Sequence, residues 1–205
     1  MKPIVLGITG ASGAVYARRL LQALLASGRE THLTISDSGR QLLEHELGLS
    51  IDLDRFRLSD LLPDAADQED RVHYHHFRDF MSPIAGGSFP TQAMVICPCS
   101  GGTLSGVATG RSGNLIQRAA EVHLKERRPL ILVTRETPLS LIQIENMQRA
   151  CLAGATLLPA SPGFYLEPKS LDDLIDFIVA RILDQLDIEH PWAPRWGTPQ
   201  ESGDA

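Results

Sequence analysis

Residues 3–25 read PIVLGITGASGAVYARRLLQALL, which is an apolar run, a glycine-rich turn and a helix-like pattern in succession. The run 3–8 is apolar throughout, as expected for a strand buried on both faces of a parallel sheet. Over 14–27, apolar side chains recur near the helical spacing: Val15, Leu20, Leu21, Leu24 and Leu25. A strand that turns directly into a helix is the repeating unit of an α/β protein.

The same alternation continues along the chain. Further strands are predicted at 31–36, 93–98, 129–134 and 155–160, and helices at 38–47, 102–109, 114–127, 140–153 and 171–187. The stretch 50–80 is polar and irregular. The pattern predicts a single α/β domain over 1–187, a Rossmann-like (flavodoxin-like) doubly wound parallel sheet. We expect 188–205 to be a proline-containing tail that packs on a neighbouring subunit or is partly disordered.

The composition argues against two classes of function. The net charge of −6 over 205 residues disfavours nucleic-acid binding, which needs concentrated positive charge. No apolar run approaches the ~20 residues of a membrane span. The chain begins directly with a strand, so no signal peptide is expected, and its three cysteines are too few for a disulfide framework. We expect a cytoplasmic protein.

The turn TGASG (9–13) predicts an anion site, because backbone N–H groups at a helix N-terminus can approach a phosphate and Ser12 adds a hydroxyl. A plain strand-to-helix turn is the alternative. A nicotinamide reductase is disfavoured, since the last glycine of the TGxxxGxG pattern is absent. The YxxxK pair of such reductases would be Tyr165 and Lys169, but Pro168 between them should break the helix they need.

The stretch CPCSGGT (97–103) fits either a metal site or a second anion site. A structural zinc site typically has four ligands, but the only other cysteine is Cys151. The run HYHH (73–76) could supply histidines, although such a run is more often a polar surface or strand edge. Residues 100–103 open the next helix with hydroxyls and backbone donors, so we favour the anion site.

Several charged residues add to this picture. Arg118 and Lys125 lie seven apart and share a helical face, which by itself is an ordinary solvated basic face. Arg135 and Glu136 follow a strand, where an Arg suits a phosphate and a Glu suits acid–base chemistry. Tyr165 and Arg181 could add a hydroxyl and a charge. No aspartate motif for a metal-bound diphosphate is found.

These segments together resemble the flavin prenyltransferases of the UbiX/Pad type. The matching segments are GITGASGAVY, MVICPCSGGTLSGVATG, NLIQRAAEVHLKERRPLILVTRETPLS, GATLLPASPGFY, SLDDLIDFIVARILDQL and PRWG. The resemblance implies a metal-independent homododecamer, built from trimers, that uses reduced FMN as substrate. It implies transfer of the dimethylallyl group of dimethylallyl monophosphate to N5 and then C6 of the flavin. A UbiD-type decarboxylase, often in ubiquinone synthesis, would receive the product.

The resemblance also implies the site residues. Flavin binding is expected at Gly10, Ala11, Ser12, Ser36, Ser100, Gly101, Gly102, Thr103 and Arg135. Binding of the prenyl phosphate is expected at Phe80, Arg118, Lys125, Tyr165 and Arg181. The expected catalytic residues are Ser12, Glu46, Lys125 and Glu136, with Ser12 and Glu136 moving protons during ring closure. No metal ligand is expected.

One position departs from the family pattern. Family members often carry Trp where this chain has Phe80, and Phe is a weaker cation–π partner than Trp. Two alternatives remain. One is a flavin-dependent decarboxylase acting directly on an aromatic acid or a peptidyl-cysteine, and the other is a non-catalytic flavin carrier. The full charged set argues against a carrier, which needs neither Lys125 nor Glu136.

Overall fold

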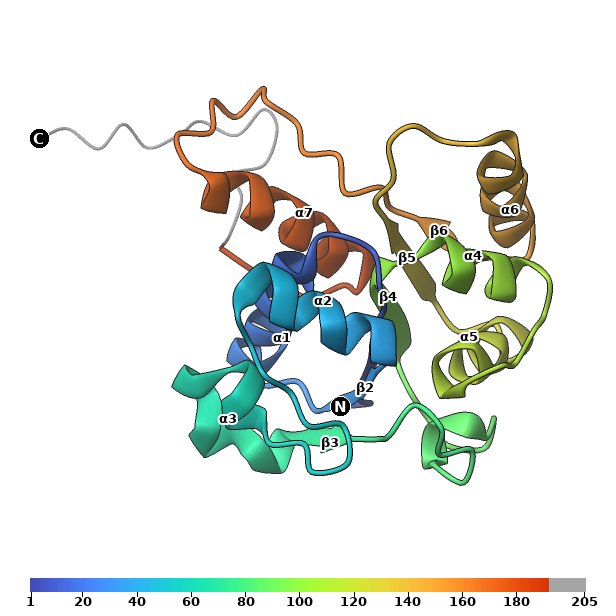
Figure 1. The fold of residues 1–205 in the computed structure, drawn as a ribbon, viewed down its shortest axis with the longest axis horizontal. Helices are drawn as coiled ribbons and strands as arrows, with labels where there is room; N and C mark the ends of the chain where they lie inside the picture. The colour runs from blue at the N-terminus through green and yellow to red at the C-terminus, as the bar shows by residue number, and fades with distance from the viewer. Residues whose placement is uncertain (192–205) are drawn as a thin grey trace, which may run out of the picture.

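A computed structural model describes residues 1–191, and a six-stranded parallel sheet forms its centre (Figure 1). The strands are β1 (Ile4–Ile8), β2 (Thr31–Ile35), β3 (Val72–Tyr74), β4 (Ala93–Cys99), β5 (Leu130–Thr134) and β6 (Thr156–Leu157). Their order is β3-β2-β1-β4-β5-β6, the Rossmann order, and without the short β3 the remaining five follow the flavodoxin order. The predicted fold class is confirmed.

Helices cover both faces of this sheet. They are α1 (Ala14–Ala26), α2 (Asp37–Leu47), α3 (Leu58–Leu61), α4 (Gly101–Ala108), α5 (Leu115–Lys125), α6 (Leu141–Leu152) and α7 (Leu171–Gln185). Alternate strand residues point to opposite faces, so Leu6 packs in a core with α1, α2 and α7, while Val5 packs in a second core with α4 and α5. The two groups of helices lie on either side of the sheet in Figure 1.

The stretch 50–80, expected to be irregular, contains regular structure that the sequence pattern did not indicate. It holds α3, the kinked 3-10 helix η1 (Pro63–Arg71) and the edge strand β3, and a second 3-10 helix, η2 (Pro83–Ala85), follows. Strand β3 has three residues, two of them His73 and Tyr74, so it lacks an apolar run. Its pairing with β2, rather than its own pattern, makes it a strand.

Helix α7 confirms the predicted capping and most of the predicted apolar stripe. Ser170 accepts a hydrogen bond from the N–H of Asp173, and the Asp173 carboxylate accepts one from the N–H of Ser170. The stripe is buried from Ile178 onward, and Ile175 packs partly buried against the same core, but Leu171 at the start of the helix is 78% exposed. No helix within residues 1–191 is long and apolar enough to cross a membrane. The predicted tail from residue 192 onward lies outside the described residues.

Candidate functional site

The loops that follow β1 and β4 meet where the strand order reverses, the usual ligand position in such sheets. Thr9 joins them. Its buried hydroxyl donates to the carbonyl of Pro98 (2.7 Å) and accepts from the N–H of Ser100 (2.8 Å). The sequence pattern assigned Thr9 no role of its own. Its only signal was a polar residue directly after an apolar strand.

The loop after β4 opens a helix with free donor groups. The Ser100 hydroxyl accepts from the N–H of Thr103 (3.3 Å) and donates to its side chain (3.0 Å). Gly101 and Gly102 begin α4, and the first N–H groups of a helix have no intrahelical partner. A side chain on Gly102 would meet nothing within 4 Å. Residues 100–103 therefore offer free backbone N–H groups in an open position, as an anion site needs.

The loop after β1 is held by a carboxylate from α2. Glu46 accepts hydrogen bonds from the N–H groups of Gly13 (3.0 Å) and Ala14 (2.8 Å). Burial works against ionisation of Glu46, but the hydrogen bonds from the Ser12 hydroxyl and these two N–H groups outweigh it, so the pKa of Glu46 is lowered. Glu46 is thus an anion at neutral pH, in contact with the Ser12 hydroxyl.

Arg135 reaches the same loop from the end of β5. Its Nε donates to the carbonyl of Ser12 (3.2 Å), and its charge contributes to the lowered pKa of Glu46. Ser36 caps α2 by accepting from the N–H of Gly39 (3.0 Å). Gly10 packs so tightly on this turn that a Cβ there would lie 2.5 Å from the Cβ of Ser38. The described structure therefore groups the expected flavin residues at one edge of the sheet.

Glu136 is positioned by a residue that the sequence pattern missed. Its carboxylate accepts from Gln143 Nε2 (3.2 Å), and the Gln143 amide oxygen accepts from the N–H of Ser140 (2.9 Å). A Cβ on Gly101 would lie 3.3 Å from the same Gln143 Nε2. Gln143 therefore lies between Glu136 and the start of α4. The capping sequence SLIQ (140–143) marked it as a helix start but not as a site residue.

Arg118, Lys125 and Phe80 form a second group, away from this edge. Arg118 Nε donates to the carbonyl of Ala85 (3.0 Å), and a Cβ on Gly87 would lie 2.9 Å from Lys125 Nζ. Phe80 lines a depression over the same segment with Ala85 and Gly86. Helix α5 ends just before β5 begins, and Arg135 follows the 5 residues of β5. At about 3.3 Å per strand residue, the start of β5, next to the end of α5, lies roughly 16 Å from Arg135.

Tyr165 and Arg181 come from the last connection and the last helix of the chain. Tyr165 is 52% exposed in the connection to α7, with its ring edge-on to Phe177 at 5.8 Å. Arg181 pairs with Asp184 (2.6 Å) near the end of α7. Gln92, which precedes β4, donates to the carbonyl of Leu186, so this end of α7 lies at the amino edge of the sheet, opposite Arg135.

The two cysteines of CPCSGGT do not form a metal pair. Cys97 packs in the core with α1 and α7, and Cys99 packs in the core with α4 and α5, because the pairing of β4 with β5 shifts register between Ile96 and Cys99. Burial raises the pKa of both thiols, that of Cys99 to about 12. Both cysteines are therefore neutral core residues, which agrees with the interpretation of the loop as an anion site.

The family model described as Flavoprotein matches residues 1–183, and the parallel sheet with two loops meeting at its reversal point agrees with that class. Within that class, this chain belongs to the UbiX family of flavin prenyltransferases. It is 50% identical, over 196 residues, to the flavin prenyltransferase UbiX of Halalkalibacterium halodurans, covering 96% of this chain and 94% of that protein.

Two solved structures are similar over nearly the whole chain. One is AnUbiX (PadA1) in complex with FMN and dimethylallyl pyrophosphate, with a TM-score of 0.85 and 36% identity over 97% of this chain and 99% of that one. The other is a dodecameric FMN-dependent UbiX-like decarboxylase from Escherichia coli O157:H7, with a TM-score of 0.84 and 39% identity over 96% and 100%.

Proposed function

We propose that this protein is a flavin prenyltransferase that joins the dimethylallyl group of dimethylallyl monophosphate to N5 and C6 of reduced FMN and releases phosphate. The observation that carries the proposal is the convergence of Ser12, Glu46, Arg135 and Glu136 from three separate segments on one sheet edge. The full-length identity to UbiX proteins supports it. This set supplies both a phosphate-binding cation and proton-carrying groups, which a simple flavin carrier does not need.

The residues present fit a flavin nucleotide. The open start of α4 at Gly101 and Gly102 offers backbone donors to an anion. The turn at Gly10 and Ala11, with Ser36 directly after β2, borders the same edge, and Arg135 adds a positive charge. When bound, reduced FMN would supply the electron-rich ring that accepts the prenyl group.

The chain's own groups can do the rest of the chemistry. Arg135 would stabilise negative charge, because preorganised donors act where charge develops. The Glu46 carboxylate can take a proton from the Ser12 hydroxyl that it contacts, and Glu136, held by Gln143, is a second acid–base group. The surrounding loops must exclude water, which would quench an allylic cation.

The second group requires another subunit. Arg118, Lys125 and Phe80 lie too far from Arg135 in one chain to touch the same small substrate, so we propose that they complete the site of a neighbouring copy, as Arg181 would. A homododecamer like the Escherichia coli relative would allow this. Exposed apolar side chains on and beside α6 support such packing: Leu139, Leu141, Ile142, Ile144 and Leu152.

The test is an anaerobic reaction of the purified protein with chemically reduced FMN and dimethylallyl monophosphate, with the pyrophosphate in a parallel arm. Release of phosphate and a flavin heavier by one isoprenyl unit would support the proposal, and the active arm would identify the donor. An unmodified flavin in both arms, with carbon dioxide released from an aromatic acid, would favour the decarboxylase alternative. A UbiD-type decarboxylase activated by the released flavin would identify the recipient.

A further inference from the structure

Four side chains with metal-binding atoms share one face of the edge pair β2–β3. His32 pairs in register with His73. Glu30 lies two residues before His32, and His75 lies two residues after His73. Residues two apart on a strand point to the same face. The pairing of β2 with β3 thus brings Glu30 and His32 next to histidines that lie 41 or more positions further along the chain.

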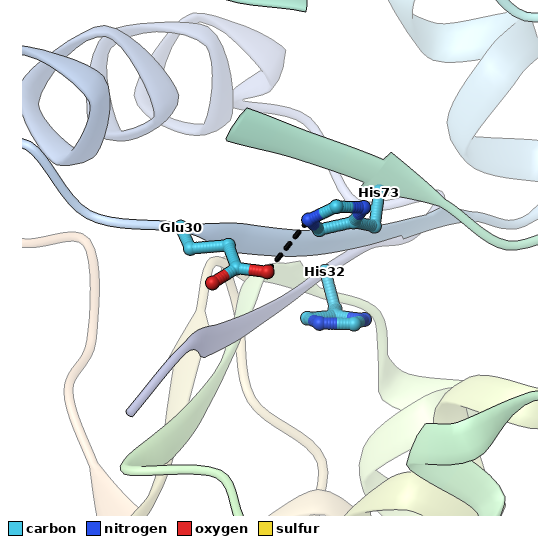
Figure 2. Close-up of side chains that lie close together, drawn as sticks. All are labelled: Glu30, His32 and His73. Carbon is cyan, nitrogen blue, oxygen red and sulfur yellow. Dashed lines mark ion pairs between the residues drawn. The ribbon is translucent and has the colours of Figure 1, made fainter. Parts of the chain in front are cut away.

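Three of these side chains are close enough to hold one ion. The ligand atoms of Glu30, His32 and His73 all lie within 4.8 Å of one another, and Glu30 Oε1 is 2.7 Å from His73 Nε2. Figure 2 shows the carboxylate and the two imidazoles gathered on the neighbouring segments. Around a tetrahedral zinc ion with bonds of 2.0–2.1 Å, the ligand atoms lie roughly 3.3 Å from one another. Small side-chain rotations would bring the three ligand atoms to such separations.

His75 holds His32 in the orientation that a ligand needs. His32 Nδ1 and His75 Nε2 are 2.7 Å apart, and the two rings are nearly coplanar, at 7°. A metal-bound histidine usually forms such a hydrogen bond with its other ring nitrogen. With the proton on Nδ1, the Nε2 atom of His32 carries a lone pair. Phe89 packs edge-on against the same ring and shields it from solvent.

His32 is the buried member of the group, at 6% exposed. The carboxylate of Glu30 and the ring of His73 remain partly exposed, so an ion can enter from solvent.

We propose that Glu30, His32 and His73 form a binding site for a divalent transition-metal ion of the zinc type, with water in the fourth position. Two imidazoles and one carboxylate are a known ligand set for zinc. The site is separate from the proposed prenyl transfer: His32 lies near the start of β2, roughly 13 Å along the strand from Ser36. A bound ion would fasten the short edge strand β3 to β2.

The test is titration of the metal-free full-length protein, prepared with EDTA and dialysed, with Zn²⁺ by calorimetry and with Co²⁺ by visible absorption. We expect one Zn²⁺ per chain and the d–d spectrum of tetrahedral Co²⁺. The Glu30→Gln and His73→Gln variants should each bind at least 100-fold more weakly. His75→Ala should weaken binding about 10- to 100-fold, as expected for an outer hydrogen-bond partner.

The matched control is His76→Gln, since His76 adjoins the group but lies 3.6 Å from Asp54 instead. It should bind Zn²⁺ like the unaltered protein. Thermal unfolding in EDTA checks that each variant folds, and added Zn²⁺ should raise the unfolding temperature of the unaltered protein but not of His73→Gln. Equal Zn²⁺ affinity in all variants, or no saturable binding by the unaltered protein, would overturn the proposal.

Discussion

The carboxylate of Glu46 accepts a 2.8 Å hydrogen bond from the backbone N–H of Ala14, so a side chain of α2 caps the first turn of α1. The N–H of Gly13 is bound by the same carboxylate. One donor of the TGASG turn and the first donor of α1, both of which could bind a phosphate, are therefore already occupied. The start of α4, where Gly102 is open, is the better anion site of the two.

Removing the charge of Glu46 should destabilise the fold in a pH-dependent way. Its pKa is lowered in the folded chain, so its contribution is present above its unfolded pKa and is lost as the pH falls through the folded value. We expect Glu46→Gln to lower the free energy of unfolding by about 1 kcal/mol or less at pH 7, because the cap is exposed. Urea unfolding at pH 7 and in acid measures it. A loss that is equal at both pH values would contradict this interpretation.

Replacing Thr9 by valine should loosen the junction of the two flavin loops. The change leaves the N–H of Ser100 without its partner and removes one of the two hydrogen bonds that the Pro98 carbonyl accepts from Thr9, at a cost of about 1–3 kcal/mol. Chemical denaturation and FMN titration measure the loss. Thr31→Val is the matched control, because the buried Thr31 hydroxyl has no hydrogen-bond partner. It should be neutral or stabilising, and similar losses in both variants would refute a special role for Thr9.

Glu136→Ala should retain FMN but slow prenylation about 10²- to 10⁴-fold, the usual range for loss of a general acid or base. Normal product formation would remove Glu136 from the mechanism. Single-turnover phosphate release measures the rate.

Gln143→Ala should act through Glu136, slowing the reaction by about tenfold to a hundredfold without changing FMN affinity. It should also change the pH dependence of the rate, which a purely structural defect would not do. Gln148→Ala, exposed on the same helix, is the control. A rate equal to that of the unaltered protein would exclude the positioning role.

Lys125→Ala should likewise keep FMN and lose about 10²–10³ in rate, as expected for a lost phosphate donor.

If Lys125 serves a neighbouring copy, co-assembled Lys125→Ala and Glu136→Ala chains should restore activity. With random mixing in equal amounts, roughly one quarter of the sites would contain both intact residues. Each variant mixed with itself should stay inactive, and Lys2→Ala is a control at an exposed lysine. Absence of recovery in verified mixed oligomers would place Lys125 and Glu136 in one chain's site.

Phe80→Trp should raise the rate of prenyl transfer several-fold, since Trp is the stronger cation–π partner. Phe80 is 46% exposed within one chain, so the change should leave stability nearly unaltered. Steady-state rates with saturating donor check it. An unchanged rate would mean that this ring does not face the developing cation.

Local sequence patterns predicted most of the fold. The buried strands, the helix starts at Ser100 and Ser170 and the glycine turns are local features, since they depend on residue type and spacing over a few positions. Strand β3 was not predicted, because three residues without an apolar run carry no periodicity. The site residues were identified by resemblance, whereas their grouping was not visible in any local pattern.

The sequence by itself determined the α/β class, the capped start of α4 and the residue types available at the edge of the sheet. Only the tertiary structure decided which of them meet. Thr9 contacts Pro98 across 89 positions and Arg135 contacts Ser12 across 123, whereas Lys125 and Arg135 lie at opposite edges although only ten residues separate them. The physical reason is that periodicity fixes each element, but the order of strands in the sheet fixes which loops become neighbours.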